Sequence, residues 1–209
     1  MYKEKNKQEP FSMSSEKKLS LSFNSPVILT FTFLCFAVLV LDTFTAGWVT
    51  SSFFSVYRSS FANPLTYLRM FTHVLGHADW NHLFGNITMI LVIGPLLEEK
   101  YGSFKIILVI LITALVTGLV NFFFFPNVRL LGASGVVFAF ILLSSFTCTQ
   151  EGKIPVTFIL VALVYIGQQL YQAFFVKDNV SNLAHLLGGG VGSVFGYLMN
   201  KSKKENKYY

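Results

Sequence analysis

The stretch that decides the fold is Leu131-Gly132-Ala133-Ser134-Gly135-Val136-Val137-Phe138, in which a polar connection becomes a long apolar run. A serine at this boundary stands at the start of a helix, beside backbone N–H groups that have no intrahelical partner. Gly132 and Gly135 flank it and allow another chain to approach closely. We therefore predict that Ser134 begins a helix and acts as a nucleophile.

The composition around this stretch is that of a membrane protein. Hydrophobic residues make up 53% of the chain and charged residues 12%, and the mean hydropathy is +0.58. A helix needs about 20 apolar residues to cross a bilayer core of about 30 Å. Lipid offers no partners to backbone groups, and the alternating pattern of a β-barrel is not visible. We predict an all-α, polytopic membrane protein with six transmembrane helices at about 27–46, 82–97, 104–125, 135–149, 154–175 and 183–200.

The charges predict how this bundle is oriented. Both termini are expected in the cytoplasm, because 12 of the 16 Lys and Arg residues then lie inside, as the positive-inside rule requires. Residues 1–22 form a polar tail that we expect to be disordered, 23–200 form one helical domain, and 201–209 form a basic tail. The net charge of +6 is read as this orientation signal, and no nucleic-acid partner is expected.

The segment from Gly47 to about Asn81 is expected outside and is too long for a simple turn. Its many aromatic residues suit a structure in the headgroup layer, which serves either as a lateral rim or as a partner surface.

Polar residues next to this segment indicate a buried site. His82 and Asn86 are four apart and share one helical face, as helix-to-helix hydrogen-bonding groups or as functional donors. His73 and His77 are also four apart, but no HExxH glutamate or Cys/His cluster accompanies them, so we predict no metal and no cofactor.

A common depth links the polar residues of three helices. His82, Ser134 and His185 each precede the first cytoplasmic polar residue of their helix (Glu98, Gln150 and Lys201) by 16 positions. At about 1.5 Å per residue the three lie at one level. An imidazole activates a serine hydroxyl near neutral pH, so we predict His185 as the base. We expect His82, Asn86, Gly132 and Ala133 to stabilise the oxyanion and the substrate.

Small residues would allow the two reacting helices to meet. Gly188, Gly192 and Gly196 form a ladder with four-residue spacing, which begins three residues after His185. Such a ladder brings helix backbones together, and Gly135 is the expected small residue on the serine helix.

With these residues in view, the chain resembles the rhomboid family of intramembrane serine proteases between about Tyr67 and Met199. The matching motifs are Gly132-Ala133-Ser134-Gly135 for GxSG, His82-Leu83-Phe84-Gly85-Asn86 for HxxxN, and 184–192 for AHxxGxxxG. The resemblance implies a six-helix rhomboid fold, a Ser134–His185 dyad without a third acid, and cleavage of membrane-anchored proteins near the outer part of their transmembrane segments. The chain departs from many relatives at Phe138, which replaces a tyrosine, and at Tyr57-Arg58, which replaces Trp-Arg.

Other classes of function fit less well. An intramembrane zinc protease needs an HExxH helix and an aspartyl one needs two intramembrane aspartates, whereas only Asp42 lies near a helix. A rhomboid-like protein that binds helices without cutting them remains open, as does a transporter or channel. The small six-helix form suggests a bacterial cytoplasmic membrane. The sequence predicts neither the natural substrate nor the oligomeric state.

Overall fold

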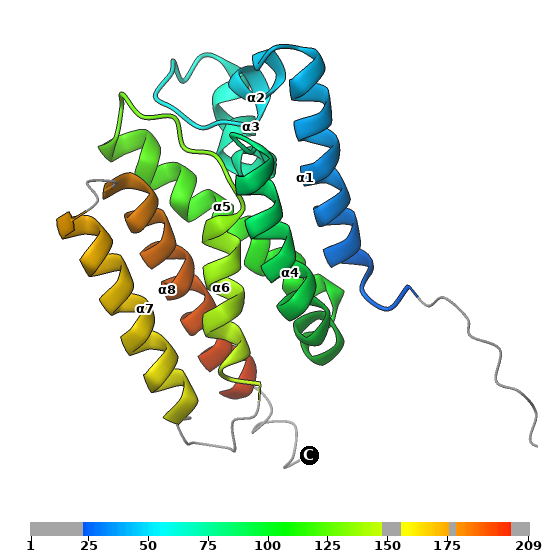
Figure 1. Ribbon diagram of the computed structural model, residues 1–209, viewed down its shortest axis with the longest axis vertical. Helices are drawn as coiled ribbons and strands as arrows, with labels where there is room; N and C mark the ends of the chain where they lie inside the picture. Colours follow the sequence, from blue (N-terminus) through cyan, green and yellow to red (C-terminus); the bar gives the residue numbers. More distant parts are fainter. Residues whose placement is uncertain (1–22, 148–155, 176–178, 202–209) are drawn as a thin grey trace, which may run out of the picture.

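The computed structural model describes residues 23–147, 156–175 and 179–201, and the regular structure in these ranges is helical apart from one β-bridge (Figure 1). The elements are α1 (Pro26–Phe44), α2 (Trp48–Phe53), α3 (Pro64–Thr72), the 3-10 helix η1 (His73–Leu75), α4 (Trp80–Tyr101), α5 (Ser103–Phe124), α6 (Ser134–Ser144), α7 (Val156–Phe175) and α8 (Asn179–Lys201). Each of the six predicted apolar blocks contains a helix, but the fourth, predicted at 135–149, ends early: α6 stops at Ser144 and 145–147 form a turn.

The boundaries of α4 correct one expectation. Residues 98–101, which lie beyond the end predicted for this helix at about 97, are its last turn, and the chain reverses at Gly102, whose φ is 85°. Glycine adopts a positive φ readily, so the chain can turn from the end of α4 directly into α5. Gln150 and the predicted tails at 1–22 and 202–209 lie outside the described residues.

Three of the described helices are long and apolar enough to cross a membrane, namely α1, α4 and α5, and α6 is a shorter apolar helix of 11 residues. Large apolar side chains on their outer faces are exposed, for example Phe33 (67%) and Val92 (63%). A surrounding lipid bilayer explains this exposure, because contact of such large apolar faces with water would be unfavourable.

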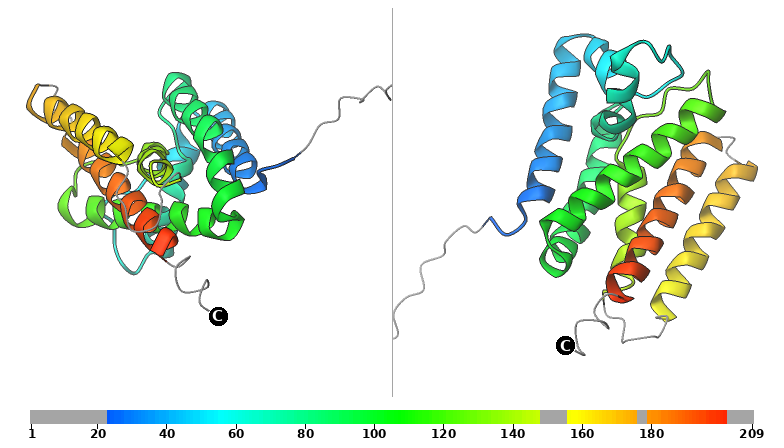
Figure 2. Two further views of the ribbon diagram at one scale, coloured as in Figure 1. Left: turned by 90° about the horizontal axis from the view of Figure 1, so that it is seen from below. Right: turned by 180° about the vertical axis from the view of Figure 1, so that it is seen from behind.

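The short helix α6 lies in the centre of the bundle, between α4, α5 and α8 (Figure 2). Leu83 and Ile90 of α4, Ile106 of α5, and Phe140 and Leu143 of α6 are fully buried and form the core between these helices. The helix α7 lies at one edge against α8, and α1 lies at the other edge against α4 (Figure 1).

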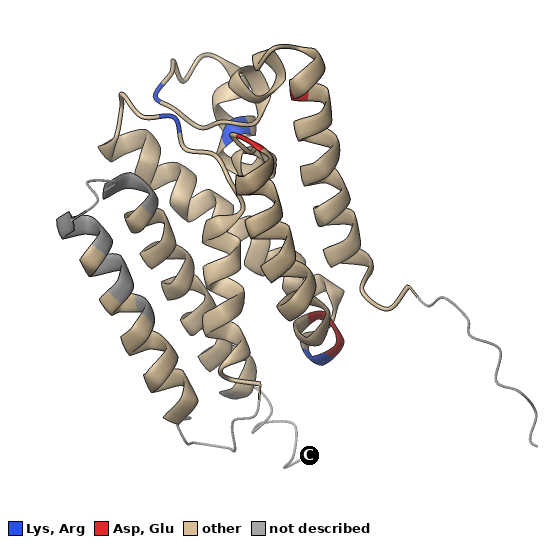
Figure 3. Ribbon diagram, viewed as in Figure 1, with Lys and Arg blue, Asp and Glu red and all other residues tan. Residues whose placement is uncertain are grey.

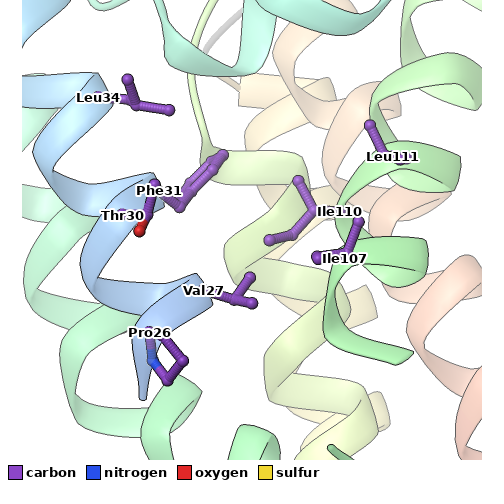
Figure 4. Close-up of a pocket in the computed structure, with 8 residues that line it drawn as sticks. All are labelled: Pro26, Val27, Thr30, Phe31, Leu34, Ile107, Ile110 and Leu111. Atoms are coloured by element: carbon purple, nitrogen blue, oxygen red, sulfur yellow. The ribbon is translucent and has the colours of Figure 1, made fainter. Parts of the chain in front are cut away.

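The helices α1 and α4 pack closely against each other, whereas the packing of α1 against α5 leaves a groove. A Cβ atom at Gly94 of α4 would lie 2.6 Å from the Ile28 side chain, so only glycine fits there. Between α1 and α5 an apolar groove of about 370 Å³ remains (Figure 4). It is lined by Pro26, Val27, Thr30, Phe31, Leu34, Ile107, Ile110 and Leu111.

A buried carboxylate joins α4 to the start of α1. Glu98 is 4% exposed, and its carboxylate accepts hydrogen bonds from Val27 N (3.0 Å), Ile28 N (3.0 Å) and Ser103 Oγ (2.7 Å). Pro26 at the first helical position has no N–H, and Leu29 N already donates to Ser25 O. Glu98 therefore supplies the acceptors that the first turn of α1 needs.

The described charges gather at the two ends of the bundle and leave its middle uncharged (Figure 3). One end carries the α4–α5 turn at Gly102, the start of α1 and the end of α8 (Figure 1). The other carries residues 45–79 and 125–133 and is called the loop end below.

The loop end is held together by the pairing of two connections that are distant in sequence. Val56 and Leu130 form an antiparallel bridge through two backbone hydrogen bonds. The buried Asn121 side chain donates to Val56 O (3.0 Å) and Val128 O (3.1 Å) and so joins both segments to α5. This attachment holds the connection that leads into Ser134.

Candidate active site

Ser134 is the first residue of α6, and it is half-buried. The preceding Gly132 has a φ of 120°, a conformation that favours glycine, and its N–H donates to His73 O at 2.9 Å. The first intrahelical hydrogen bond runs from Val137 N to Ala133 O. The amides before Val137 are therefore available to an acceptor near the Ser134 hydroxyl.

The start of α4 lies against this turn. Asp79 caps the helix by accepting from His82 N at 2.8 Å, and His82 and Asn86 follow on one face. A Cβ atom at Gly132 would lie 2.8 Å from His82 Nε2 and 3.8 Å from Asn86 Nδ2. The structure thus brings His82 and Asn86 to the turn before Ser134, and leaves no room there for a larger residue than glycine.

Two nitrogen donors face this turn. Ala78 N donates to His82 Nδ1 at 3.5 Å, so in the neutral ring the proton lies on Nε2, the nitrogen beside Gly132. Asn86 is 7% exposed, and its Nδ2 has no hydrogen-bond partner in the described part of the chain. A buried amide donor without a partner is costly unless a ligand or water accepts from it.

The helix α8 packs on α6 through glycines. A Cβ atom at Gly188 would collide with the Gly135 carbonyl oxygen, one at Gly192 with the Ala139 carbonyl oxygen, and one at Gly196 with the Phe146 ring. All three members of the predicted ladder therefore face α6. Gly135 contributes from the other side, since a Cβ atom there would lie 3.6 Å from Ala184 O.

This packing sets His185 beside the serine helix. The imidazole ring is half-buried, and its centre lies 4.5 Å from that of Phe138 at an interplanar angle of 44°. Phe138 is four residues after Ser134 and so lies on the same face of α6. The turn of α8 that carries His185 therefore packs against the turn of α6 that carries Ser134.

Two further histidines support the site, and sequence reasoning gave them no role there. His73 is fully buried, with Nδ1 on Arg69 O (3.1 Å) and Nε2 on Thr117 Oγ1 (3.2 Å). Burial lowers its pKa to about 4, so the ring is neutral near pH 7. Its carbonyl holds Gly132, as described above. The sequence showed that His73 and His77 are four residues apart, but it gave no sign that His73 would bond to Thr117, 44 positions away.

His77 lies behind His82. It is fully buried, its ring centre lies 5.1 Å from that of His82, and Nδ1 is bound to Leu75 O at 3.1 Å. Burial, and secondarily the neighbouring His82, lower its pKa to about 4. The described residues contain no group of three or more His, Cys, Asp or Glu side chains arranged to hold a metal ion.

Fold and site define a helical, multi-pass membrane protein with a serine and histidines packed inside the bundle. Residues 64–202 match the rhomboid domain, and the chain belongs to the rhomboid family. The predicted resemblance is thereby confirmed.

Relatives come from animals, plants and bacteria. The chain is 34% identical over 155 residues to rhomboid-related protein 2 of Mus musculus, which covers 65% of this chain and 51% of that protein. It is 29% identical over 140 residues to rhomboid-related protein 1 of Caenorhabditis elegans, covering 63% of this chain and 39% of that one. With rhomboid protease GlpG of Haemophilus influenzae it shares 26% over 142 residues, covering 66% and 72%. The chain spans about half of the mouse relative and less than half of the nematode one.

Proposed function

We propose that the chain is an intramembrane serine endopeptidase that cleaves membrane-anchored proteins near the outer part of their transmembrane segments. The observation that carries the proposal is the glycine-mediated packing of α8 on α6, together with the 4.5 Å contact between Phe138 and His185. Family membership supports it, since one relative is named a protease.

In the proposed reaction, Ser134 Oγ attacks a peptide carbonyl carbon while His185 accepts the hydroxyl proton. The oxyanion that forms accepts hydrogen bonds from the free amides at the start of α6, from His82 Nε2–H and from Asn86 Nδ2. The C–N bond then breaks, and His185 returns the proton to the leaving amine. Water attacks the acyl-enzyme by the same route and releases Ser134.

Phe138 has a positioning role in this scheme. Its ring supports one face of the His185 imidazole, which restricts the rotation of the base. It cannot donate the hydroxyl hydrogen bond that a tyrosine would, so packing alone orients the histidine from this side. Gly132 and Ala133 shape the turn on which the substrate carbonyl would lie.

The proposal extends to topology. Six helices cross the membrane, the start of α1 and the end of α8 face the cytoplasm, and the loop end faces outward. The distribution of Lys and Arg supports this orientation. The proposed setting is a bacterial cytoplasmic membrane.

A paired experiment separates the enzyme from a helix-binding relative without activity. Purified protein is incubated with a fluorescent serine-directed phosphonate and, separately, with a reporter that has one transmembrane segment. We expect labelling and cleavage by the natural chain, no labelling of Ser134→Ala, and turnover lowered at least about 10⁴-fold in Ser134→Ala and His185→Ala.

The matched control is Ser145→Ala, since Ser145 lies at the opposite end of α6 and its hydroxyl donates to Ile141 O. Labelling and cleavage should remain near normal in this variant. Cleavage that persists in folded Ser134→Ala protein would reject the catalytic assignment. Binding of the reporter without cleavage by the natural chain would instead favour the inactive, helix-binding class.

A further inference from the structure

Two arginines contact one tyrosine ring at the loop end, and a third arginine is the residue that follows this tyrosine. The guanidinium carbons of Arg69 and Arg129 lie 4.6 and 4.9 Å from the centre of the Tyr57 ring, and Arg58 is the next residue in the chain. Tyr57 and Arg129 are neighbours because Val56 pairs with Leu130 in antiparallel register. Figure 3 shows the positive segments of this end on the loops and on α3.

No carboxylate of the described residues neutralises this cluster. The described acidic residue of the loop end is Asp79, and Asp42 lies in the last turn of α1, which leads into it; each accepts a backbone N–H, from His82 and Thr50 respectively. Arg69 is buried and donates to Ser52 O. The outward-facing side of the cluster is therefore cationic.

The two exposed arginines retain hydrogen-bond donors. Arg58 donates from Nε to Phe122 O (3.3 Å) and from Nη2 to Phe123 O (2.9 Å), which fixes its guanidinium at the end of α5; its other N–H groups have no acceptor among the described residues. Arg129 is exposed, and within the described ranges its guanidinium stacks on Tyr57. A guanidinium held on one face presents its N–H fork to an oxyanion ligand.

An apolar rim adjoins these donors. Phe61 packs on Phe122 with ring centres 5.1 Å apart, and the side chains of Phe61 (55%), Phe123 (49%) and Phe124 (73%) are exposed. Phe123 and Phe124 continue the lipid-facing surface of α5 to its end. Aromatic side chains with adjacent cations suit the level of lipid headgroups.

We propose that Arg58 and Arg129, with the rim of Phe61, Phe123 and Phe124, bind the headgroup of an anionic phospholipid. The phosphate accepts hydrogen bonds from the guanidinium groups, and the glycerol and upper acyl carbons lie against the phenylalanine rings. Charge complementarity and continuity with the lipid-facing side of α5 favour a lipid over an acidic peptide segment. Arg129 precedes Gly132 by three residues, so a bound headgroup would hold the connection that leads into α6.

The test does not depend on catalysis. The full chain is reconstituted into phosphatidylcholine vesicles that contain a trace of phosphatidylglycerol with a photoreactive headgroup, or of phosphatidylcholine with the same group. After illumination, the crosslinked peptides are identified by mass spectrometry. We expect crosslinks in 56–61 and 123–130 that are several-fold stronger for the anionic probe, and about fivefold weaker in Arg129→Gln.

Lys105→Gln is the matched control, because it removes one exposed positive charge from the opposite end of α5. It should leave these crosslinks unchanged. In the natural chain, roughly 0.5 M salt should weaken them, a result that needs no variant. Equal crosslinking by both probes, or no loss in Arg129→Gln, would overturn the proposal. If millimolar inorganic phosphate added to the vesicles abolishes the crosslinks, the site binds free anions instead of a lipid. If Arg129→Gln keeps the crosslinks but cleaves acidic substrates poorly, the site binds substrate instead.

Discussion

Removing the Glu98 carboxylate should detach the start of α1 from the bundle. In Glu98→Ala the N–H groups of Val27 and Ile28 and the Ser103 hydroxyl lose their acceptor. Each buried polar group left unpaired costs about 1–3 kcal/mol, and breaking a buried charged interaction typically costs about 3–5 kcal/mol in all. We therefore expect the free energy of unfolding to fall by about 3–5 kcal/mol. Glu98→Gln should cost less, about 2 kcal/mol, because one amide oxygen still accepts while the amide NH₂ faces a donor.

The measurement is thermal unfolding in detergent, followed by intrinsic fluorescence. For a chain of this size, about 2–4 °C is lost per kcal/mol, so Glu98→Ala should lower the Tm by roughly 6–20 °C. Hydrogen exchange offers a local readout, since the amides of Val27 and Ile28 should exchange much faster in the variant. The control is Glu99→Gln, which changes the exposed neighbour. A Tm unchanged in Glu98→Ala, or lowered equally in Glu99→Gln, would refute the reasoning.

Two further outcomes follow from the packing and from the buried histidine. Gly188→Val should separate α8 from α6 and lower the Tm by several degrees, because a Cβ atom there collides with the Gly135 carbonyl oxygen. The control Gly190→Ala should leave the Tm unchanged, because a Cβ atom at that position meets open space. Equal losses of Tm in the two variants would contradict this reasoning. His73 has a pKa of about 4 in the fold against about 6.5 when unfolded, so the unfolded chain binds a proton that the fold excludes. The free energy of unfolding should fall by up to roughly 1.4 kcal/mol per pH unit from pH 6.5 to 4, and pH-dependent unfolding of His73→Gln should show a shallower slope; an identical slope would exclude this histidine as the cause.

The helices and the family were predictable because their signals are local. Six apolar blocks mark six helices, and the spacing of four residues between Gly188 and Gly192 marks the face of α8 that meets α6. The pairing of His82 with Asn86 also follows from helical spacing. The contact of both with Gly132 was expected only because three motifs shared one depth, and the structure brings these three residues together.

The contacts that the sequence did not reveal join residues far apart in the chain. From the sequence Glu98 would be expected to face solvent, since a carboxylate near a helix end is usually hydrated. Its carboxylate oxygens instead accept hydrogen bonds from the first turn of a helix about 70 residues earlier. Tyr57 between two arginines and His73 on Thr117 are similar cases. No periodic pattern encodes such pairs, because each depends on how the helices are arranged in space.

The helix α6 is short for a membrane-spanning helix, since its eleven residues span only about 16 Å, roughly half of a hydrocarbon core. In the topology and reaction proposed above, Ser134 at its start would be within reach of ligands from water and from lipid. An inhibitor dissolved in water would then descend past the loops, whereas a lipophilic one would concentrate in the bilayer and arrive from the side. Partitioning into lipid should therefore govern apparent potency as strongly as the chemistry of the reactive group, and potencies measured in detergent and in vesicles should rank compounds differently.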